Sequence, residues 1–149
     1  MKKEDINEFW RAKEKEAQSR LVIASFATYI EGYPGLRGPI HGLLYLMENG
    51  FYFENFEKKD MWSTLFQKNR SFRKTYLKVP IKSISEVSVF GTYINGQRIV
   101  GRIGNILRKK LRGISIRFLS EDNQRLSISF ECIENPMQIY EKYSELIKK

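Results

Sequence analysis

The segment between His41 and Phe56 constrains the fold of this chain more than any other. Two apolar runs, 41–47 and 51–56, flank the tripeptide Glu48-Asn49-Gly50. Asn-Gly tolerates the positive φ angles of a tight turn, and apolar runs on both sides of it are typical of a β-hairpin. The segment therefore predicts two antiparallel strands in a β-rich domain.

Other segments have the composition of strands as well. Around the turn 120–124, apolar and polar residues alternate with the period of two that a half-buried strand requires, which predicts a second hairpin. Pro80 indicates an edge strand or a bend, because proline cannot donate a ladder hydrogen bond. The further segments read as strands are 21–30, 76–80, 84–93, 114–119 and 125–130.

Helical patterns occur near both ends of the chain. Residues 4–19 predict an amphipathic helix that packs on the domain's own core; its apolar face is Ile6, Phe9, Trp10, Lys13 and Ala17. Asn135 can cap a C-terminal helix and Pro136 suits its first position, so a helix is expected over 135–148. Its apolar face is read as Met137, Tyr140, Tyr143 and Ile147.

The composition fits one domain. The chain has 149 residues, of which 42% are hydrophobic and 29% charged, as in a globular protein. No apolar run is long enough to span a bilayer, and the N-terminus lacks the apolar core of a secretory signal. The single cysteine, Cys132, is expected to be buried and inert and cannot form an internal disulfide. We therefore expect a soluble, cytoplasmic protein.

Two stretches carry a resemblance to a known superfold. They are Gly42-Leu-Leu-Tyr-Leu-Met-Glu-Asn-Gly-Phe-Tyr-Phe53 and Leu77-Lys-Val-Pro-Ile-Lys-Ser-Ile-Ser-Glu-Val87. The first is similar to the pattern G-x-L-Y-L-x-x-x-G-x-Y-F of the second and third strands in pleckstrin-homology (PH) domains, especially GRAM and bacterial PH-like members. The second is similar to the strand that follows in those families. The resemblance covers about residues 21–147.

The resemblance implies a mainly β fold and a non-catalytic binding module. The expected architecture is a PH-like bent β-barrel of about seven antiparallel strands, closed by a C-terminal α-helix and preceded by an extra N-terminal helix. Residues 1–20 would be the N-terminal amphipathic helix, and 21–149 the barrel domain with its helix at 135–148. Members of the superfold bind lipid headgroups or protein surfaces.

Positive charge is concentrated in the middle of the chain. The formal net charge is +9, yet residues 61–120 hold thirteen cations and one acid, Glu86, whereas the remainder holds thirteen cations and sixteen acids. Such an asymmetry creates a local field that attracts anions. The alternative is a solvated basic surface that serves solubility.

The cations do not lie where PH domains hold phosphoinositides. Those domains carry a basic cluster between the first two strands, but residues 31–39 contain Arg37 as their only cation, together with an acid, Glu31. An anion would therefore bind elsewhere. The predicted ligand-binding residues are Lys68, Arg70, Arg73, Lys74, Arg98, Arg102, Arg108, Lys109, Lys110 and Arg112.

Aromatic residues alternate with cations in 62–74. Trp62 and Phe66 could enter the headgroup layer of a membrane while the cations meet anionic lipid. The same mixture suits nucleic acid, with rings stacking on bases, or the rings could cover the core. The predicted membrane or partner contacts are Phe9, Trp10, Trp62 and Phe66.

The segment 98–112 is expected to form a short basic helix at 104–111 whose cations share one face. Val100-Gly-Arg-Ile-Gly is similar to the GxxG loop of KH domains, which clamps nucleic acid. Arg98 to Arg102 and Arg108 to Arg112 have the RxxxR form of PilZ domains, which bind cyclic dinucleotides. No phosphate-binding loop is predicted, because Arg102-Ile103 stands where such a loop needs Lys followed by Ser or Thr.

Catalytic chemistry has little support in the sequence. His41 is the single histidine and lies in a predicted strand, where a surface or hydrogen-bonded role is expected. No Cys/His spacing suits zinc, and no pair of acids suggests opposed pKa shifts. We predict no catalytic residue, metal or cofactor. The favoured partner is an anionic lipid surface at the inner membrane. The alternatives are a protein partner or self-association, and nucleic acid or a cyclic dinucleotide at 98–112.

Overall fold

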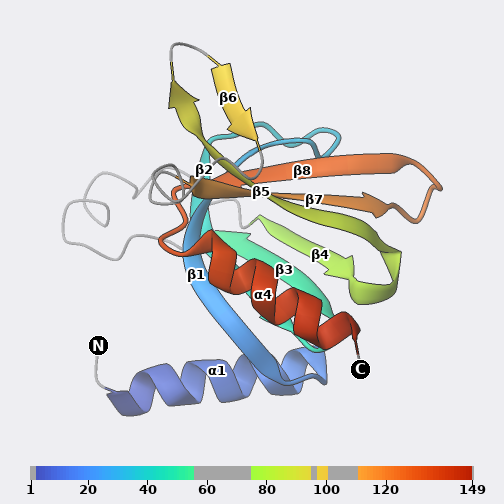
Figure 1. Cartoon of the computed structure of the whole chain (residues 1–149). Coiled ribbons are helices and arrows are strands. Elements are labelled where there is room, and N and C mark those ends of the chain that lie inside the picture. The colour runs from blue at the N-terminus through green and yellow to red at the C-terminus, as the bar shows by residue number, and fades with distance from the viewer. Residues whose placement is uncertain (1–2, 56–74, 95–96, 101–110, 149) are drawn as a thin grey trace, which may run out of the picture.

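The computed structural model describes residues 3–55, 75–94, 97–100 and 111–148 (Figure 1). A helix stands near each end of the chain: α1 (Lys3–Ala17) and α4 (Pro136–Ile147). Between them lie β1 (Leu21–Glu31), β2 (Ile40–Met47), β3 (Gly50–Asn55), β4 (Tyr76–Pro80), the 3-10 turn η1 (Ile81–Ser83), β5 (Ile84–Ile94), β6 (Gln97–Val100), β7 (Leu111–Leu119) and β8 (Arg125–Glu131). The expectation of a mainly β fold with a helix near each end is confirmed.

The eight described strands form one antiparallel sheet in the order β4-β3-β2-β1-β8-β7-β5-β6. Strands β1 to β4 are a continuous meander, and β1 joins this meander to β8, β7 and β5 on its other side. Within the described strands, β4 and β6 are the edges, so the sheet is not closed. The strand that the sequence pattern missed is β6.

Both predicted hairpins are present. In the first, Leu46 pairs with Phe51 and Leu44 with Phe53 across β2 and β3. Glycine is needed at Gly50 because a Cβ atom there would collide with the carbonyl oxygen of Val79 on the neighbouring strand β4. In the second hairpin, β7 and β8 pair in unbroken register on either side of the turn 120–124.

The inner face of the sheet encloses the main hydrophobic core. The rings of Tyr29 and Phe53 both contact Phe130, with centroids 5.8 and 5.1 Å apart, so β1, β3 and β8 meet there. Buried residues of β4 and β5 belong to the same cluster as these rings, although the two strands lie far apart in the order of the sheet. The sheet therefore curves around a single core.

Helix α4 covers this core through a face that differs from the predicted one. The side chain of Asn135 accepts a hydrogen bond from the Gln138 amide at 3.2 Å, and Pro136 follows it, as expected from the sequence. The buried face consists of Pro136, Ile139 and Tyr143, with Leu146 packed beside it. The predicted face was wrong in two of its members, since Tyr140 is 38% exposed and Ile147 54% exposed. Apolar residues form two overlapping stripes on this helix, and helical spacing alone does not distinguish them.

Helix α1 covers part of the outer face of the sheet (Figure 1). Its Trp10 packs edge-on against Tyr45 with ring centroids 5.4 Å apart, and Tyr45 stacks on Tyr52 at 5.3 Å. Met47 is buried in the same small cluster. The two faces of the sheet are thus covered by different helices.

One local expectation is wrong, and another concerns residues outside the described ranges. Cys132 is exposed rather than buried, because β8 ends at Glu131 and the next residue turns the chain toward α4 with φ +60°. The predicted helix 104–111 falls outside the described residues except for Leu111, which begins β7. None of the helices within the described ranges is long and apolar enough to cross a membrane.

The assignment of the buried face of α4 leads to a stability prediction. Tyr143→Ala should lower the free energy of unfolding by about 3–4 kcal/mol, because it removes a buried ring that contacts Phe51 at 5.8 Å. Tyr140→Ala, one turn away and more exposed, should cost less than about 1 kcal/mol. Urea unfolding of both variants measures the difference; equal losses would contradict the assignment.

Candidate functional site

Most of the predicted anion-binding residues lie outside the described residues. These are Lys68, Arg70, Arg73, Lys74, Arg102, Arg108, Lys109 and Lys110, and Trp62 and Phe66 lie outside them as well. Arg98 belongs to β6, where it pairs with Tyr93 of β5. Arg112 is exposed on β7, and its guanidinium donates to the carbonyl oxygen of Glu134 at 3.3 Å. What the structure does establish is where the basic segments join the sheet.

The two ends of segment 56–74 are fastened to each other. The Thr75 amide donates to the side-chain oxygen of Asn55 at 2.7 Å, and the Asn55 amide donates to the Thr75 carbonyl at 3.2 Å. The segment therefore leaves β3 and returns to β4 at one point. By sequence it carries six cations and two acids.

Segment 101–110 connects β6 to β7, the two strands that pair with opposite sides of β5. The residue before it, Val100, pairs with Phe90, and the residue after it, Leu111, pairs with Gly91. The segment therefore leaves and returns at adjacent positions of one strand. It carries four cations and no acid.

Both segments join the same end of the sheet. Asn55 pairs with Gly42, which pairs with Ala27 of β1, and the next residue of β1, Thr28, pairs with Glu131 at the end of β8. Strands β3, β6 and β8 end here, and β4 and β7 begin here. We call this edge, defined by Asn55, Thr75, Val100 and Leu111, the basic end.

Formal charge distinguishes the two segments that join the basic end from the rest of the protein. The two segments carry +4 each, or +8 of the chain's net +9. The described residues hold fourteen cations and fifteen acids, a net charge of −1. The excess positive charge of this protein therefore belongs to two segments that join one end of a nearly neutral sheet.

The loop between β1 and β2 is organised by a buried tyrosine. The hydroxyl of Tyr29 accepts a hydrogen bond from the Tyr33 amide at 2.8 Å and donates to the Leu36 carbonyl at 3.2 Å. Burial raises the pKa of Tyr29, so its hydroxyl stays protonated and can donate. Arg37, the cation of this loop, is exposed.

An ionic cluster lies between α1 and the outer face of the sheet. Glu54 of β3 is 5% exposed, and both of its carboxylate oxygens accept from the Lys13 ammonium at 2.8 Å. The Tyr45 hydroxyl donates to the same carboxylate at 3.0 Å. Burial, and then the nearby charge of Glu54, raise the pKa of Tyr45 well above its usual value. Lys13, which the sequence placed on the apolar face of the helix, belongs there because its charge is paired.

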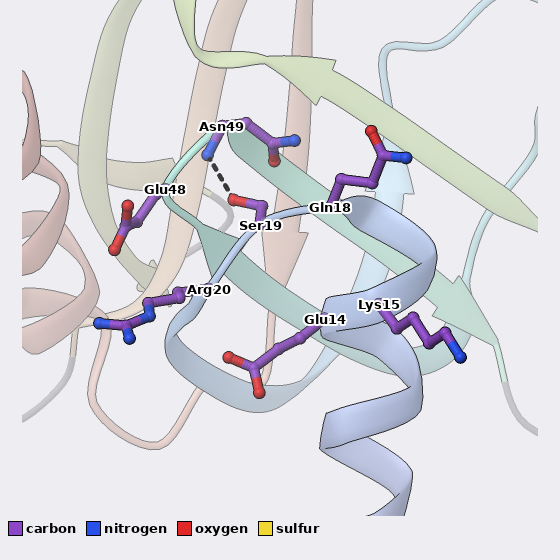
Figure 2. A pocket seen from close by; sticks show the side chains of 7 residues that line it. All are labelled: Glu14, Lys15, Gln18, Ser19, Arg20, Glu48 and Asn49. Atoms are coloured by element: carbon purple, nitrogen blue, oxygen red, sulfur yellow. Dashed lines mark hydrogen bonds between the residues drawn. The ribbon is translucent and has the colours of Figure 1, made fainter.

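The turn that follows α1 is tied to the first hairpin. Asn49 donates its side-chain amide to the Ala17 carbonyl at 3.0 Å, and its backbone amide donates to the Ser19 hydroxyl at 3.1 Å. Its side-chain oxygen accepts from the Tyr52 hydroxyl at 2.8 Å. A shallow pocket opens beside this junction and is lined by Glu14, Lys15, Gln18, Ser19, Arg20, Glu48 and Asn49 (Figure 2).

The polar groups around the pocket hold the helix in place. Figure 2 shows the Ser19 hydroxyl directed at the Asn49 amide. The Glu14 carboxylate accepts from the Leu21 amide at 3.0 Å, and the Glu48 amide donates to the Arg20 carbonyl at 3.0 Å. These contacts assign the pocket a structural role at the helix–hairpin junction.

The histidine behaves as its strand position predicts. His41 is exposed, and its Nδ1 lies 2.9 Å from the hydroxyl of Thr28 on the neighbouring strand. Within the described ranges, no three His, Cys, Asp or Glu side chains are grouped as metal ligands would be.

Two mutations at the buried ionic cluster should change the free energy of unfolding by different amounts. Lys13→Met should lower the free energy of unfolding by about 3 kcal/mol, because it leaves the buried Glu54 carboxylate without its cation. Glu16→Gln removes the other partner of Lys13, 3.8 Å away and exposed, and should change stability by less than about 0.5 kcal/mol. Denaturant titrations of both variants test this; a loss in Lys13→Met no larger than in Glu16→Gln would refute it.

The raised pKa of Tyr45 predicts a loss of stability at alkaline pH. Tyrosines of the unfolded chain ionise near pH 10, whereas folding keeps Tyr45 protonated. Above that pH the folded state holds more protons than the unfolded state, so its stability falls as the pH rises. Below about pH 10, the contribution of protonated Tyr45 to the stability of the folded state is fully present.

The Tyr45→Phe variant should show a shallower alkaline decline in the free energy of unfolding than the wild type. Tyr33→Phe, which removes the hydroxyl of an exposed ring, serves as the control. Unfolding measured at several alkaline pH values gives the slopes. Parallel curves for wild type and Tyr45→Phe would show that burial of this phenol does not contribute to the alkaline loss of stability.

Comparison with known proteins gives a likeness of fold. No family model matches the chain, and no curated protein sequence matches it. Among solved structures, it is similar to the C-terminal domain of an unknown protein from Leishmania infantum. The TM-score is 0.53 at 11% sequence identity, and the match covers 97% of this chain and 99% of that one. At this identity the likeness concerns the arrangement of elements alone.

Proposed function

We propose that this protein is a non-catalytic module that binds an anionic membrane surface through its basic end. In this proposal the protein acts at the cytoplasmic side of the membrane as a peripheral component. Segments 68–74 and 98–112 supply the cations that meet acidic headgroups. The rest of the domain is a scaffold that holds the two segments at one end.

One observation carries the proposal: +8 of the net +9 charge belongs to two segments that join the same end of the sheet. Cations spread over a whole surface would give a weak and uniform field. Gathered at one end, each cation near an anionic membrane contributes about 1 kcal/mol of attraction, and the protein meets the surface in one orientation.

The strand order supports a PH-like architecture as part of the proposal. Strand β1 belongs to the meander β1–β4 and also pairs with β8, which continues the sheet to β7 and β5. One C-terminal helix covers the core that these strands enclose. A PH-like barrel would be built from the same order with its halves bent toward each other. The β5–β6 hairpin would then be an addition to the seven strands of that plan.

A vesicle-binding experiment tests the proposal. The protein should co-sediment with vesicles of mixed phosphatidylserine and phosphatidylcholine, should ignore phosphatidylcholine alone, and should be released by raised salt. Arg108/Lys109/Lys110→Glu should abolish binding, because it changes the charge of segment 101–110 from +4 to −2. A single-stranded oligonucleotide is tested in parallel.

A matched control keeps the total charge change the same. Lys82/Arg125/Lys148→Glu also changes the charge by −6, at exposed residues of the described chain. Lys82 belongs to η1, which is hydrogen-bonded to the β2–β3 turn at the end of the sheet opposite the basic end. This control should retain most of the binding. Equal losses in both triple variants, binding to neutral vesicles, or binding to the oligonucleotide alone would overturn the proposal.

A further inference from the structure

The outer face of the sheet has a row of four paired residues that α1 leaves partly exposed. Phe26 of β1 pairs with Leu43, Leu43 pairs with Glu54, and Glu54 pairs with Tyr76. Phe26 is 68% exposed and Tyr76 47% exposed, and Leu43 between them is half-buried. We call these four residues the outer row.

All four residues of the outer row face the same side of the sheet as α1. Leu43 packs against the Tyr45–Tyr52 cluster beneath the helix, and Tyr76 contacts Tyr52 with ring centroids 6.2 Å apart. Glu54 binds Lys13 of the helix. Phe26 alternates with Ala27, which points into the inner core, so its ring must point outward.

The charge of the outer row is neutralised within the protein. Glu54 is its only ionisable carboxylate, and this carboxylate is buried and paired with Lys13 at 2.8 Å. The exposed part of the row consists of an aromatic ring at each end and leucine between them. Tyrosine is enriched at the level of lipid headgroups, and phenylalanine and leucine are typical of apolar faces that enter the interface.

The outer row lies directly beside the basic end. Asn55, where segment 56–74 leaves the sheet, follows Glu54, and Thr75, where the segment returns, precedes Tyr76. Tyr76 thus lies two residues from a segment carrying +4, and Phe26 lies at the other end of the same row, on β1. That combination is complementary to a surface with negative charge outside and hydrocarbon beneath.

From this placement, and resting on the proposed function, we infer that the outer row is the apolar contact through which the protein enters an anionic lipid surface. Phe26 is its principal anchor, and Tyr76 sits at the headgroup level. The basic end supplies the attraction that brings the protein to the membrane, and the outer row fixes its orientation there.

This assignment replaces the exposed side of α1 as the membrane contact. Phe9 and Ile6 are partly exposed on that helix, but its residues hold five acids against four cations, one of which is the paired Lys13. Asp5 and Glu8 are exposed next to Ile6 and Phe9, where an anionic surface would repel them. Trp10 is committed to Tyr45.

Partitioning onto mixed phosphatidylserine and phosphatidylcholine vesicles tests the anchor. Phe26→Ser should weaken partitioning about tenfold, because the ring would no longer be removed from water. Leu119→Ser is the matched control: this residue of β7 is 46% exposed and borders the 120–124 turn. Its partitioning should match that of the wild type.

A second measurement does not depend on a loss of binding. Phe26→Trp should gain fluorescence that brominated lipids quench when vesicles are added, beyond the quenching seen with the native tryptophans. Leu119→Trp should show no such gain. Because the variant keeps an aromatic ring at the site, it tests the inference even if Phe26→Ser is poorly folded, which circular dichroism would reveal.

The outcomes separate this inference from the proposed function. If the wild type fails to bind anionic vesicles, the proposed function fails and the inference fails with it. If the wild type binds but Phe26→Ser behaves like Leu119→Ser and Phe26→Trp shows no added quenching, the inference alone is overturned. Loss of a dimer in Phe26→Ser, with lipid binding unchanged, would assign the row to a second copy of the chain and also overturn it.

Discussion

Both faces of the sheet carry buried aromatic side chains, Phe53 and Phe130 on the inner face and Tyr45 and Tyr52 on the outer one. A sheet with one apolar face can leave the other to water, but this one needs cover on both sides. The inner face is covered because the strands curve around the inner core and α4 lies across it. On the outer face, α1 covers the cluster of Tyr45, Met47 and Tyr52.

The cover that α1 provides is held by polar contacts as much as by apolar ones. Trp10 supplies the apolar contact, Lys13 neutralises Glu54, and Asn49 fastens the turn after the helix. Buried charge is costly unless it is paired, so the Lys13–Glu54 pair fixes the position of the helix more strictly than packing alone would. Where this cover stops, Phe26 and Tyr76 are left exposed.

The sequence predicted the elements better than their contacts. The hairpins were evident because a turn dipeptide and alternating side chains are local signals, and the caps of α4 were evident for the same reason. The buried face of α4 was misread because Ile139 and Leu146 offer a stripe as regular as that of Tyr140 and Ile147. Strand β6 was missed because Gln97 to Val100 pairs along only one side and carries a weak pattern of four residues.

For the candidate site as well, the sequence indicated the segments but not how they come together. Composition located the basic segments, but no local signal reveals that Asn55 and Leu111 lie at one end of a sheet, since this depends on the pairing of the five strands from β3 to β7. Pairings such as Lys13 with Glu54, 41 residues apart, are equally invisible along the chain. The exposure of Phe26 also depends on where α1 ends its cover, which a strand pattern cannot show.

The two hydrogen bonds between Asn55 and Thr75 have a consequence for how this protein can change over evolutionary time. They close the base of segment 56–74, so β3 and β4 are joined at that point by contacts that do not involve the segment itself. Loop-closure entropy rises only slowly with length, by about 0.6 kcal/mol for each doubling. The segment can therefore be lengthened, shortened or rewritten while the sheet is conserved, so relatives of this fold could share the scaffold and differ in what they recognise.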